Sequence, residues 1–421
     1  MQFEPALRDC VGDACAEFRA AALEGEEERR VDSLDVDAAI LHGRDAGGQF
    51  DQLAGSGFRA GIGPLVSVLL ESDGKQVNIP LVNQLSGDGV GAGTLRGKEE
   101  MMDSYGFPIW ADWARNAVAN NRASNKESSF NVRSTARDLL RGWARRIVRD
   151  DLVDTLLSIP TASIQAGRLQ EPGNRVNGVK WSAASAAQKN SWNVANYDRV
   201  LYGAALGNYA ATVAASLLNV DGAADKMSAA IGSLAKSLAK QSGVDPNNPG
   251  VYNGRPKITP WEIEELDEEM YVCFLGDRAF QSLQNDPAML QANRDARARE
   301  GSPTTTNPIF TGGALKYDGI LYKNIPEITQ RLLLKQAGAA SVDVEPFFLC
   351  GQAAMAYATG QLPRPTQLED GDYDFVTGLG IEAQYGVGKI AKAPLTVPNA
   401  TAGDLVDWGM VTGFVAAPTP A

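Results

Sequence analysis

The sequence predicts an α+β fold. Strand-like and helix-like segments are mixed along its 421 residues, without the regular βαβ alternation that a doubly wound parallel sheet requires. The chain is 44% hydrophobic, which is enough for one large core or two modest ones. Its 43 glycines and 21 prolines indicate many turns. We therefore expect a loop-rich chain of mixed secondary structure, and no internal repeat is visible.

The first 60 residues are strongly acidic. They hold thirteen acidic and six basic side chains, within a chain whose formal net charge is −12. An acidic helical piece followed by a glycine-rich link is expected here, without the basic and apolar pattern of a signal peptide. Because contact with a DNA backbone needs Lys and Arg, the charge argues against a sequence-specific nucleic-acid binder.

Residues 64–86 contain two β-prone stretches on either side of Asp73-Gly74. This dipeptide favours a hairpin turn because both residues tolerate positive φ. Pro80 is expected at a strand edge or a bulge, since proline has no N–H to donate. A glycine cluster between Gly87 and Gly93 follows. Together these features predict a projecting hairpin with a glycine-rich return, which would gain stability against a neighbouring molecule.

The clearest helix is predicted over residues 134–157, with Ser134 as its N-cap and Pro160 beyond its end. Apolar residues recur there at three- and four-residue spacing, which predicts one apolar face. The residues of that face are Leu139, Leu140, Trp143, Ala144, Ile147 and Val148.

An arginine stripe follows the same helix at every fourth position. Its members are Arg133, Arg137, Arg141, Arg145 and Arg149. With Arg146 and Asp138, residues 133–149 carry a net charge of +5. Like charges at this spacing repel by roughly 0.2–0.5 kcal/mol per pair. The stripe is therefore either a solvated face or a surface that meets an acidic neighbour, and each copy of an acidic, self-assembling protein would offer such a surface.

Further elements follow the predicted helix. Alanine-rich helices are expected at about 200–240, where the uncharged run 200–220 is rich in small and polar residues, so a buried helical segment is favoured over a membrane span. Buried strands are expected at 270–276, 319–325, 344–351 and 378–390, with a helix from Asp277. The last 28 residues, rich in Ala, Pro and Thr, are expected to form an extended tail.

No motif predicts catalysis, a cofactor or a metal. The segment 93–99 is one residue short of a phosphate-binding loop and has Glu99 where Ser or Thr would hold magnesium. The acidic run 369–374 lacks the glycine and glutamate of a calcium loop. His42 has no Cys or His neighbour, and Cys10 and Cys15 lack the spacing of a metal or redox site. We expect no enzyme activity, and four reduced, mostly packed thiols.

Two segments together resemble the major capsid proteins of tailed bacteriophages. ESDGKQVNIPLVNQLSGDGVGAGTLRGKEEMMDSYGFPIWADWARNAVA (71–119) is similar to that family's extended loop, with its Leu-x-Gly-x-Glu-Glu and Arg-x-Ala-Val patterns. NPIFTGGALKYDGILYKNIPEI (307–328) is similar to its Asn-Pro-x-Phe-Thr-Gly segment. Other segments follow in the family's order, so the resemblance covers about 65–395. Leu275-Gly276 replaces the family's usual His-Pro-like step.

The resemblance implies the Hong Kong 97-type capsid fold. Its parts would be an N-terminal arm (1–64), an extended loop (65–115), a peripheral domain with a long spine helix (116–164), an axial domain (165–362), a return strand of the peripheral domain (363–393) and a C-terminal tail (394–421). The sequences of the acidic N-terminal segment and of the tail after about 395 match none of the family's motifs.

The function that the resemblance implies is self-assembly. Hexamers and pentamers would form an icosahedral head around double-stranded DNA, without sequence-specific contact or a membrane, in the host cytoplasm and then in the virion. Portal and scaffolding or decoration proteins would be further partners. The expected interface residues are Asp73, Gly74, Lys75, Lys98, Glu99, Glu100, Arg137, Arg141, Arg145 and Arg149. The alternatives are an encapsulin-like bacterial nanocompartment shell protein and, more remotely, a soluble hydrolase that uses a carboxylate pair.

Overall fold

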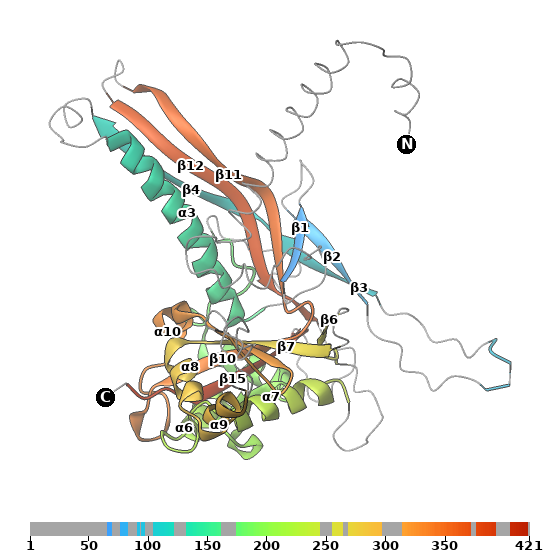
Figure 1. Cartoon of the computed structure of the whole chain (residues 1–421). Coiled ribbons are helices and arrows are strands. Elements are labelled where there is room, and N and C mark those ends of the chain that lie inside the picture. Colours follow the sequence, from blue (N-terminus) through green and yellow to red (C-terminus); the bar gives the residue numbers. More distant parts are fainter. Residues whose placement is uncertain are drawn as a thin grey trace, which may run out of the picture. The chain divides into compact units, whose positions relative to one another are not determined.

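The computed structural model contains both helices and mixed sheets, which confirms the α+β prediction (Figure 1). All described residues belong to the second of the two units into which the chain divides, Phe58–Ala421. They are residues 65–69, 76–82, 91–92, 94–96, 104–121, 132–160, 174–244, 255–263, 268–296, 314–371, 376–392 and 405–419. The predicted arm and the Asp73-Gly74 turn lie outside them.

The first sheet has the order β1-β11-β12-β4 within the described residues. These strands are β1 (Leu65–Leu69), β4 (Asp112–Asn121), β11 (Met355–Gly371) and β12 (Val376–Lys389). β1 runs parallel to β11, whereas β12 is antiparallel to both β11 and β4. Successive side chains of a strand point to opposite faces of the sheet. Each face of this sheet therefore packs against a different element of the chain.

The long helix α3 (Val132–Leu156) packs on one face of this sheet. Tyr357 of β11 and Tyr385 of β12 stack there with ring centroids 5.8 Å apart, and Val148 of α3 packs with them. The helix begins two residues before Ser134, so the predicted N-cap is wrong. Its buried stripe is also narrower than predicted, because one sheet covers only one side of it: Leu140 is 5% exposed but Leu139 is 66% exposed.

The opposite face of the sheet is covered by a hairpin of β2 (Gln76–Val82) and β3 (Ser104–Trp110). The predicted pairing across Asp73-Gly74 is wrong, because β1 pairs with β11 and β2 pairs with β3. Burial of apolar side chains explains the difference, because Ile79 and Phe107 pack against Ala356 of β11. The free energy gained from this burial exceeds what a favourable turn sequence contributes. Pro80 is exposed on β2, which has one partner strand among the described residues, as predicted for an edge.

The second sheet of the described chain has the order β5-β15-β10-β7-β9-β8, and β6 also pairs with β7. Its strands are β5 (Val200–Tyr202), β6 (Trp261–Ile263), β7 (Glu268–Leu275), β8 (Ala314–Tyr317), β9 (Ile320–Asn324), β10 (Val344–Cys350) and β15 (Met410–Ala416). The strands predicted at 270–276, 319–325 and 344–351 correspond to β7, β9 and β10 and are confirmed. The strand predicted at 378–390 corresponds to β12 of the first sheet.

The remaining elements are short. They are α5 (Ala186–Ala195), α6 (Val213–Leu218), α7 (Ala229–Gln241), α8 (Asp277–Gln284), α9 (Pro287–Ala296), α10 (Pro326–Leu332), β13 (Ala391–Lys392), β14 (Val406–Asp407) and 3₁₀ turns at Leu206–Asn208 and Ala339–Ser341. The helix predicted from Asp277 is α8. No helix in the described part of the chain is long and apolar enough to cross a membrane.

Three sequence predictions need correction here. The run 200–220 begins with a strand, and only Val213–Leu218 within it is α-helical. The predicted tail contains β15, a fully buried strand between β10 and β5. Its apolar side chains are buried on both faces of the sheet, as is typical of a central strand. The boundary predicted between residues 362 and 363 falls inside β11, which already joins the first sheet at Met355.

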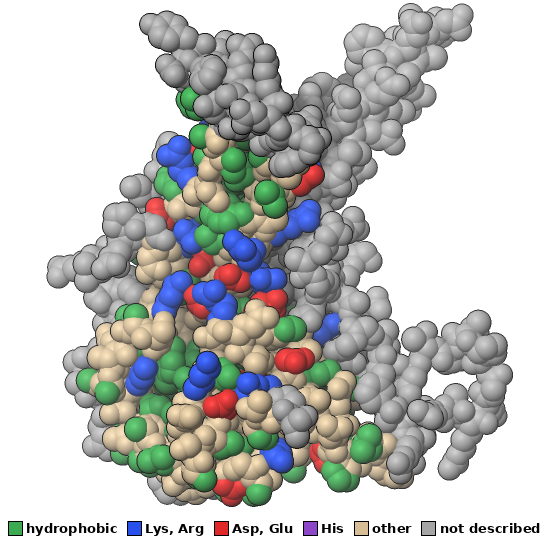
Figure 2. All heavy atoms as spheres, turned by 90° about the vertical axis from the view of Figure 1, so that its left-hand side faces the viewer, with side chains coloured by type: hydrophobic (Ala, Val, Ile, Leu, Met, Phe, Trp, Pro, Cys, Tyr) green, Lys and Arg blue, Asp and Glu red, His purple; other side chains and the backbone are tan. Residues whose placement is uncertain are grey.

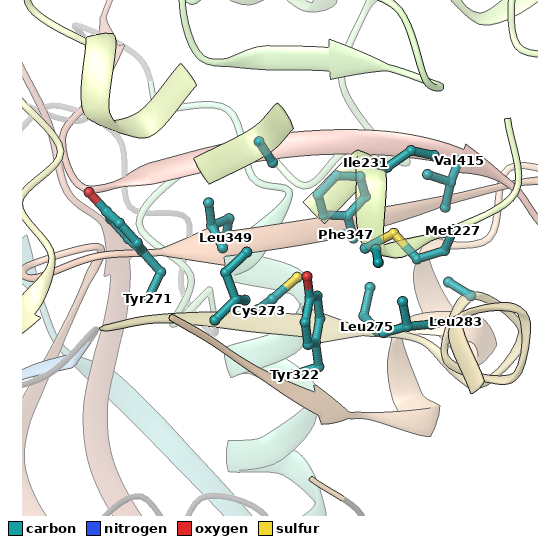
Figure 3. Packing of buried hydrophobic residues seen from close by; sticks show 14 of the residues in the cluster. Met227, Ile231, Tyr271, Cys273, Leu275, Leu283, Tyr322, Phe347, Leu349 and Val415 are labelled. Carbon is teal, nitrogen blue, oxygen red and sulfur yellow. The ribbon is translucent and has the colours of Figure 1, made fainter. Parts of the chain in front are cut away.

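The core of the second sheet lies between its strands and the helices α7 and α8 (Figure 3). Ile231 of α7 and Leu283 of α8 pack with Cys273 and Phe347 from the strands. Phe347 lies directly opposite Gly413 of β15, where an added Cβ would come within 2.1 Å of its ring. The glycine therefore makes the space that this ring occupies.

Truncation of this ring tests the core. Phe347→Ala should lower the free energy of unfolding by about 3–5 kcal/mol, because it removes buried apolar atoms and leaves a cavity above Gly413. Urea denaturation of the purified chain measures the loss. Leu206→Ala is the matched control at a side chain that is 55% exposed. Equal losses in the two variants would contradict this account of the core.

Candidate assembly surfaces

The N-terminal half of α3 presents basic side chains to the outside. Arg137 and Arg141 are exposed, and neither forms an ion pair with a residue that the structure describes. They lie four residues apart on one flank of the helix, whereas exposed Leu139 faces the other flank. Figure 2 shows a face of the molecule with basic side chains along it and acidic ones among them near its middle. Arg137 and Arg141 thus present positive charge to a partner.

Arg149, at the other end of the stripe, is used within the molecule. Its Nη1 lies 2.9 Å from a carboxylate oxygen of Glu327 in α10, and its Nη2 lies 3.3 Å from Asp150. Arg145 is half-buried. The four predicted interface arginines therefore fall into two groups, an exposed pair (Arg137 and Arg141) and a pair nearer the body of the protein.

The C-terminal end of α3 is acidic. Carboxylates at this end of a helix are opposed by the helix dipole, so Asp150, Asp151 and Asp154 need cationic partners. Arg331 of α10 binds both oxygens of Asp154, with Nε 2.8 Å from Oδ1 and Nη2 2.6 Å from Oδ2. Lys180 Nζ donates to the same carboxylate at 2.9 Å. The pairing supplies the positive charge that the helix end lacks.

Asp151 ties the same helix end to the first sheet. Arg175 Nε donates to its Oδ2 at 2.8 Å, and the Tyr385 hydroxyl of β12 donates to that oxygen at 2.7 Å. Burial, followed by the neighbouring Asp151 charge, raises the pKa of Tyr385 well above its usual range. The tyrosine therefore stays protonated and acts as a donor.

We call the contacts of Asp150, Asp151 and Asp154 with Arg331, Lys180, Arg175 and Tyr385 the α3 joint. α3 packs on the first sheet, and α10 leads towards β10 of the second. Burial raises the pKa of Asp154, but hydrogen bonds and charge from Arg331 and Lys180 outweigh it, so its net pKa lies below 3.8. Asp154 is consequently ionised near neutral pH.

Asn177 holds the root of the hairpin. Its side-chain oxygen accepts from the N–H of Trp110 at 3.0 Å, and its amide donates to the Trp110 carbonyl at 2.9 Å. Gly386 of β12 lies against the same residue, where an added Cβ would be 1.7 Å from the Trp110 carbonyl oxygen. The last residue of β3 is therefore fixed by one polar side chain and one close backbone contact.

The predicted interface residues of the extended loop lie outside the described residues. They are Asp73, Gly74, Lys75, Lys98, Glu99 and Glu100. Sequence reasoning also missed the α3 joint and the Asn177 contact. The acidic cluster at the end of an arginine-rich helix was a visible signal for the joint, whereas nothing in the local sequence marks Asn177.

The described part of the chain has no cluster of three or more His, Cys, Asp or Glu side chains that could hold a metal ion. Cys273 and Cys350 are buried free thiols, as predicted for packed cysteines. Burial raises the pKa of both well above the usual range. Cys10, Cys15 and His42 lie outside the described residues.

Residues 64–417 match a family model described as phage capsid protein. The chain belongs to the phage capsid protein family, and its function is that of a major capsid protein. No curated protein sequence matches it significantly. The resemblance inferred from the ordered sequence motifs is thereby confirmed.

Solved phage heads share the fold. The capsid asymmetric unit of cyanophage Pam1 is 28% identical, with a TM-score of 0.65 over 85% of this chain and 89% of that chain. The capsid of Ralstonia phage GP4 is 20% identical, with a TM-score of 0.59 over 85% and 88% of the two chains. The head of Helicobacter pylori bacteriophage KHP40 is 13% identical, with a TM-score of 0.52 over 84% and 87%.

The α3 joint predicts a pH-dependent stability. Because the folded pKa of Asp154 is lowered, its contribution is fully present above the ordinary value of 3.8 and is lost as the pH falls through the folded value. Arg331→Ala should therefore destabilise the chain at pH 7 by about 1–2 kcal/mol, a modest value because Arg331 is partly exposed. The deficit should shrink at pH 3.

Thermal unfolding of the wild-type and variant proteins at the two pH values measures this effect. Lys335→Ala, at an exposed cation just beyond α10, is the control and should change little at either pH. A deficit of Arg331→Ala that is the same at pH 7 and pH 3 would count against an ionic joint.

Proposed function

We propose that this chain builds an icosahedral phage head as hexamers and pentamers around double-stranded DNA, and that it has no catalytic role. The observation that carries the proposal is the family match over residues 64–417, together with 28% identity to a cyanophage capsid subunit across most of both chains. The exposed arginines of α3 and the hairpin at Asn177 supply surfaces for contacts between copies.

We also propose the Hong Kong 97-type division of the chain, with bounds adjusted to its strands. The first sheet and α3 form the peripheral domain, which takes in all of β11 and β12. The second sheet forms the axial domain near the centre of a capsomer and includes β15. β2 and β3 form the base of the extended loop, and residues 1–64 form the arm.

The extended loop is proposed to reach a neighbouring subunit. A two-stranded hairpin is at best marginally stable by itself, and here only its apolar face packs against the first sheet. The connection from Val82 to Ser104 carries Lys98, Glu99 and Glu100, which are proposed to contact the neighbour. Lys75, with the Asp73-Gly74 turn, belongs to the same proposed surface.

The exposed arginines are proposed to face an acidic surface of an adjacent copy. The chain carries a net charge of −12, so each copy offers acidic surface, while Arg137 and Arg141 are exposed and form no ion pair with a described residue. Arg145 and Arg149 are proposed as members of the same interface, with Arg149 also held by Glu327. The acidic surface argues that enclosed DNA makes few direct contacts with the shell.

The wider setting follows from the same proposal. Assembly takes place in the host cytoplasm, and the finished shell is part of the virion. A portal, which admits DNA, and scaffolding or decoration proteins are the proposed partners. Electron microscopy of the purified chain, with and without a co-expressed scaffolding protein, tests the proposal. Closed shells or capsomers are expected, and a chain that remains monomeric in every preparation would refute it.

Charge reversal tests the arginine surface. Arg137→Glu together with Arg141→Glu should reduce shell yield about tenfold or more, because two repulsions per contact are repeated over the whole shell. The thermal midpoint of the unassembled subunit should change little, since both side chains are exposed. Shell yield is measured by sedimentation and micrographs.

The control variant changes the net charge of the chain by the same amount, at exposed residues outside α3. Lys226→Glu together with Lys257→Glu alters two exposed lysines outside α3 and should leave assembly near the wild-type level. Equal yields from the two double variants would show that α3 has no special part in assembly.

A further inference from the structure

β4 is an edge strand of the first sheet as far as the structure describes it. β12 pairs with one side of it along its whole length, from Asp112 opposite Tyr385 to Asn121 opposite Val376. Along its middle, residues 115–119 all have exposed side chains. Both faces of this middle part of the strand are therefore exposed, whereas Ala114 just before it is buried against α3.

The backbone groups of β4 that point away from β12 can be identified. The N–H of Trp113 donates to the side chain of Asp112 at 2.7 Å, and the N–H of Ala117 donates to that of Asn116 at 2.9 Å. Because backbone direction alternates along a strand, the N–H groups of Arg115 and Ala119 point the same way. Since β12 lies on the other side of β4, these two groups have no partner strand among the described residues, and no turn or loop of the described chain accepts from them.

The C-terminal part of this edge, residues 116–121, lacks the features by which proteins protect a free strand. Edges are usually protected by Lys, Pro, a bulge or an inward-pointing charge. The sequence of residues 116–121 is NAVANN, and its pairing with β12 is free of register shifts. Arg115, which precedes this part of β4, has a side chain that is 72% exposed, and its Nε lies 3.6 Å from Glu382 of the paired strand β12. Val118 and Trp113 are 37% and 40% exposed, which adds apolar surface beside the open backbone groups.

We propose that the outer edge of β4 is completed by a strand from a second copy of this chain. An exposed, regular and mostly uncharged edge is a template for a further strand. A second copy is the occupant because the chain belongs to a capsid family, so that copies of itself are its nearest neighbours in a head. This inference rests on the proposed function and assigns one contact within it.

A backbone substitution separates pairing from folding. Ala119→Pro removes an N–H that points away from β12 and leaves the inward ladder intact, so the subunit should fold normally. Its shell yield should fall by about fivefold or more, because one hydrogen bond per contact is lost and proline blocks the edge. Ala119→Ser keeps the N–H and should assemble like the wild-type chain.

Val118→Pro is the matched folding control. Its N–H points toward β12, so this variant should lower the thermal midpoint of the subunit itself. Ala119→Pro should not do so. Sedimentation gives the shell yields, and thermal unfolding gives the midpoints. Shells from Ala119→Pro in the amounts that Ala119→Ser forms would overturn the proposed pairing.

Hydrogen exchange provides a direct readout in the unaltered chain. The segment 112–121 should exchange several-fold more slowly in shells than in free subunits, because its outward N–H groups gain partners. Equal exchange in intact shells would overturn the edge pairing and leave the shell function standing. A wild-type chain that forms neither shells nor capsomers would overturn both.

Discussion

The arrangement of the described elements depends on neutralising the acidic end of α3. Three aspartates there oppose the helix dipole, so the helix end is stable only when cations reach it. Those cations come from separate parts of the chain: Arg331 from α10, and Arg175 and Lys180 from the segment after α3. Because Tyr385 adds a donor from β12, the joint forms only when α3, α10, β12 and the segment after α3 are all in place.

A second polar tie lies at the last residue of β12, four residues beyond Tyr385. Lys389 and Asp407 are 1% and 2% exposed, and their charged atoms lie 2.8 Å apart. Trp192 of α5 donates to the same carboxylate at 3.2 Å, and Arg199 donates to the Asp407 carbonyl. Burying such a pair costs about as much desolvation energy as its attraction returns, so its main effect is to specify where β12 meets β14 and α5. Both ties therefore select one arrangement of strands.

Local sequence pattern predicted the elements whose evidence is local. The helix α3 and the strands β7, β9 and β10 follow from runs of apolar residues with helical or buried-strand character. The predicted pairing of β1 with β2 was wrong because β1 pairs with β11, which lies near the other end of the chain. A turn sequence predicts pairing only between strands that are neighbours in sequence. β15 was missed because the composition of the surrounding residues obscured a short, continuous apolar strand.

The same distinction applies to the candidate interfaces. The sequence alone determined the arginine spacing on α3, the net charge and the ordered motifs of a capsid family. Only the tertiary structure decided that Arg137 and Arg141 are exposed while Arg149 is held by Glu327, and that β4 lies at the edge of the sheet in the part of the chain that the structure describes. Periodicity records which residues share a face of one element. Burial, ion pairing and strand order depend on elements far apart in sequence, and these determine which charges and backbone groups remain open to another copy.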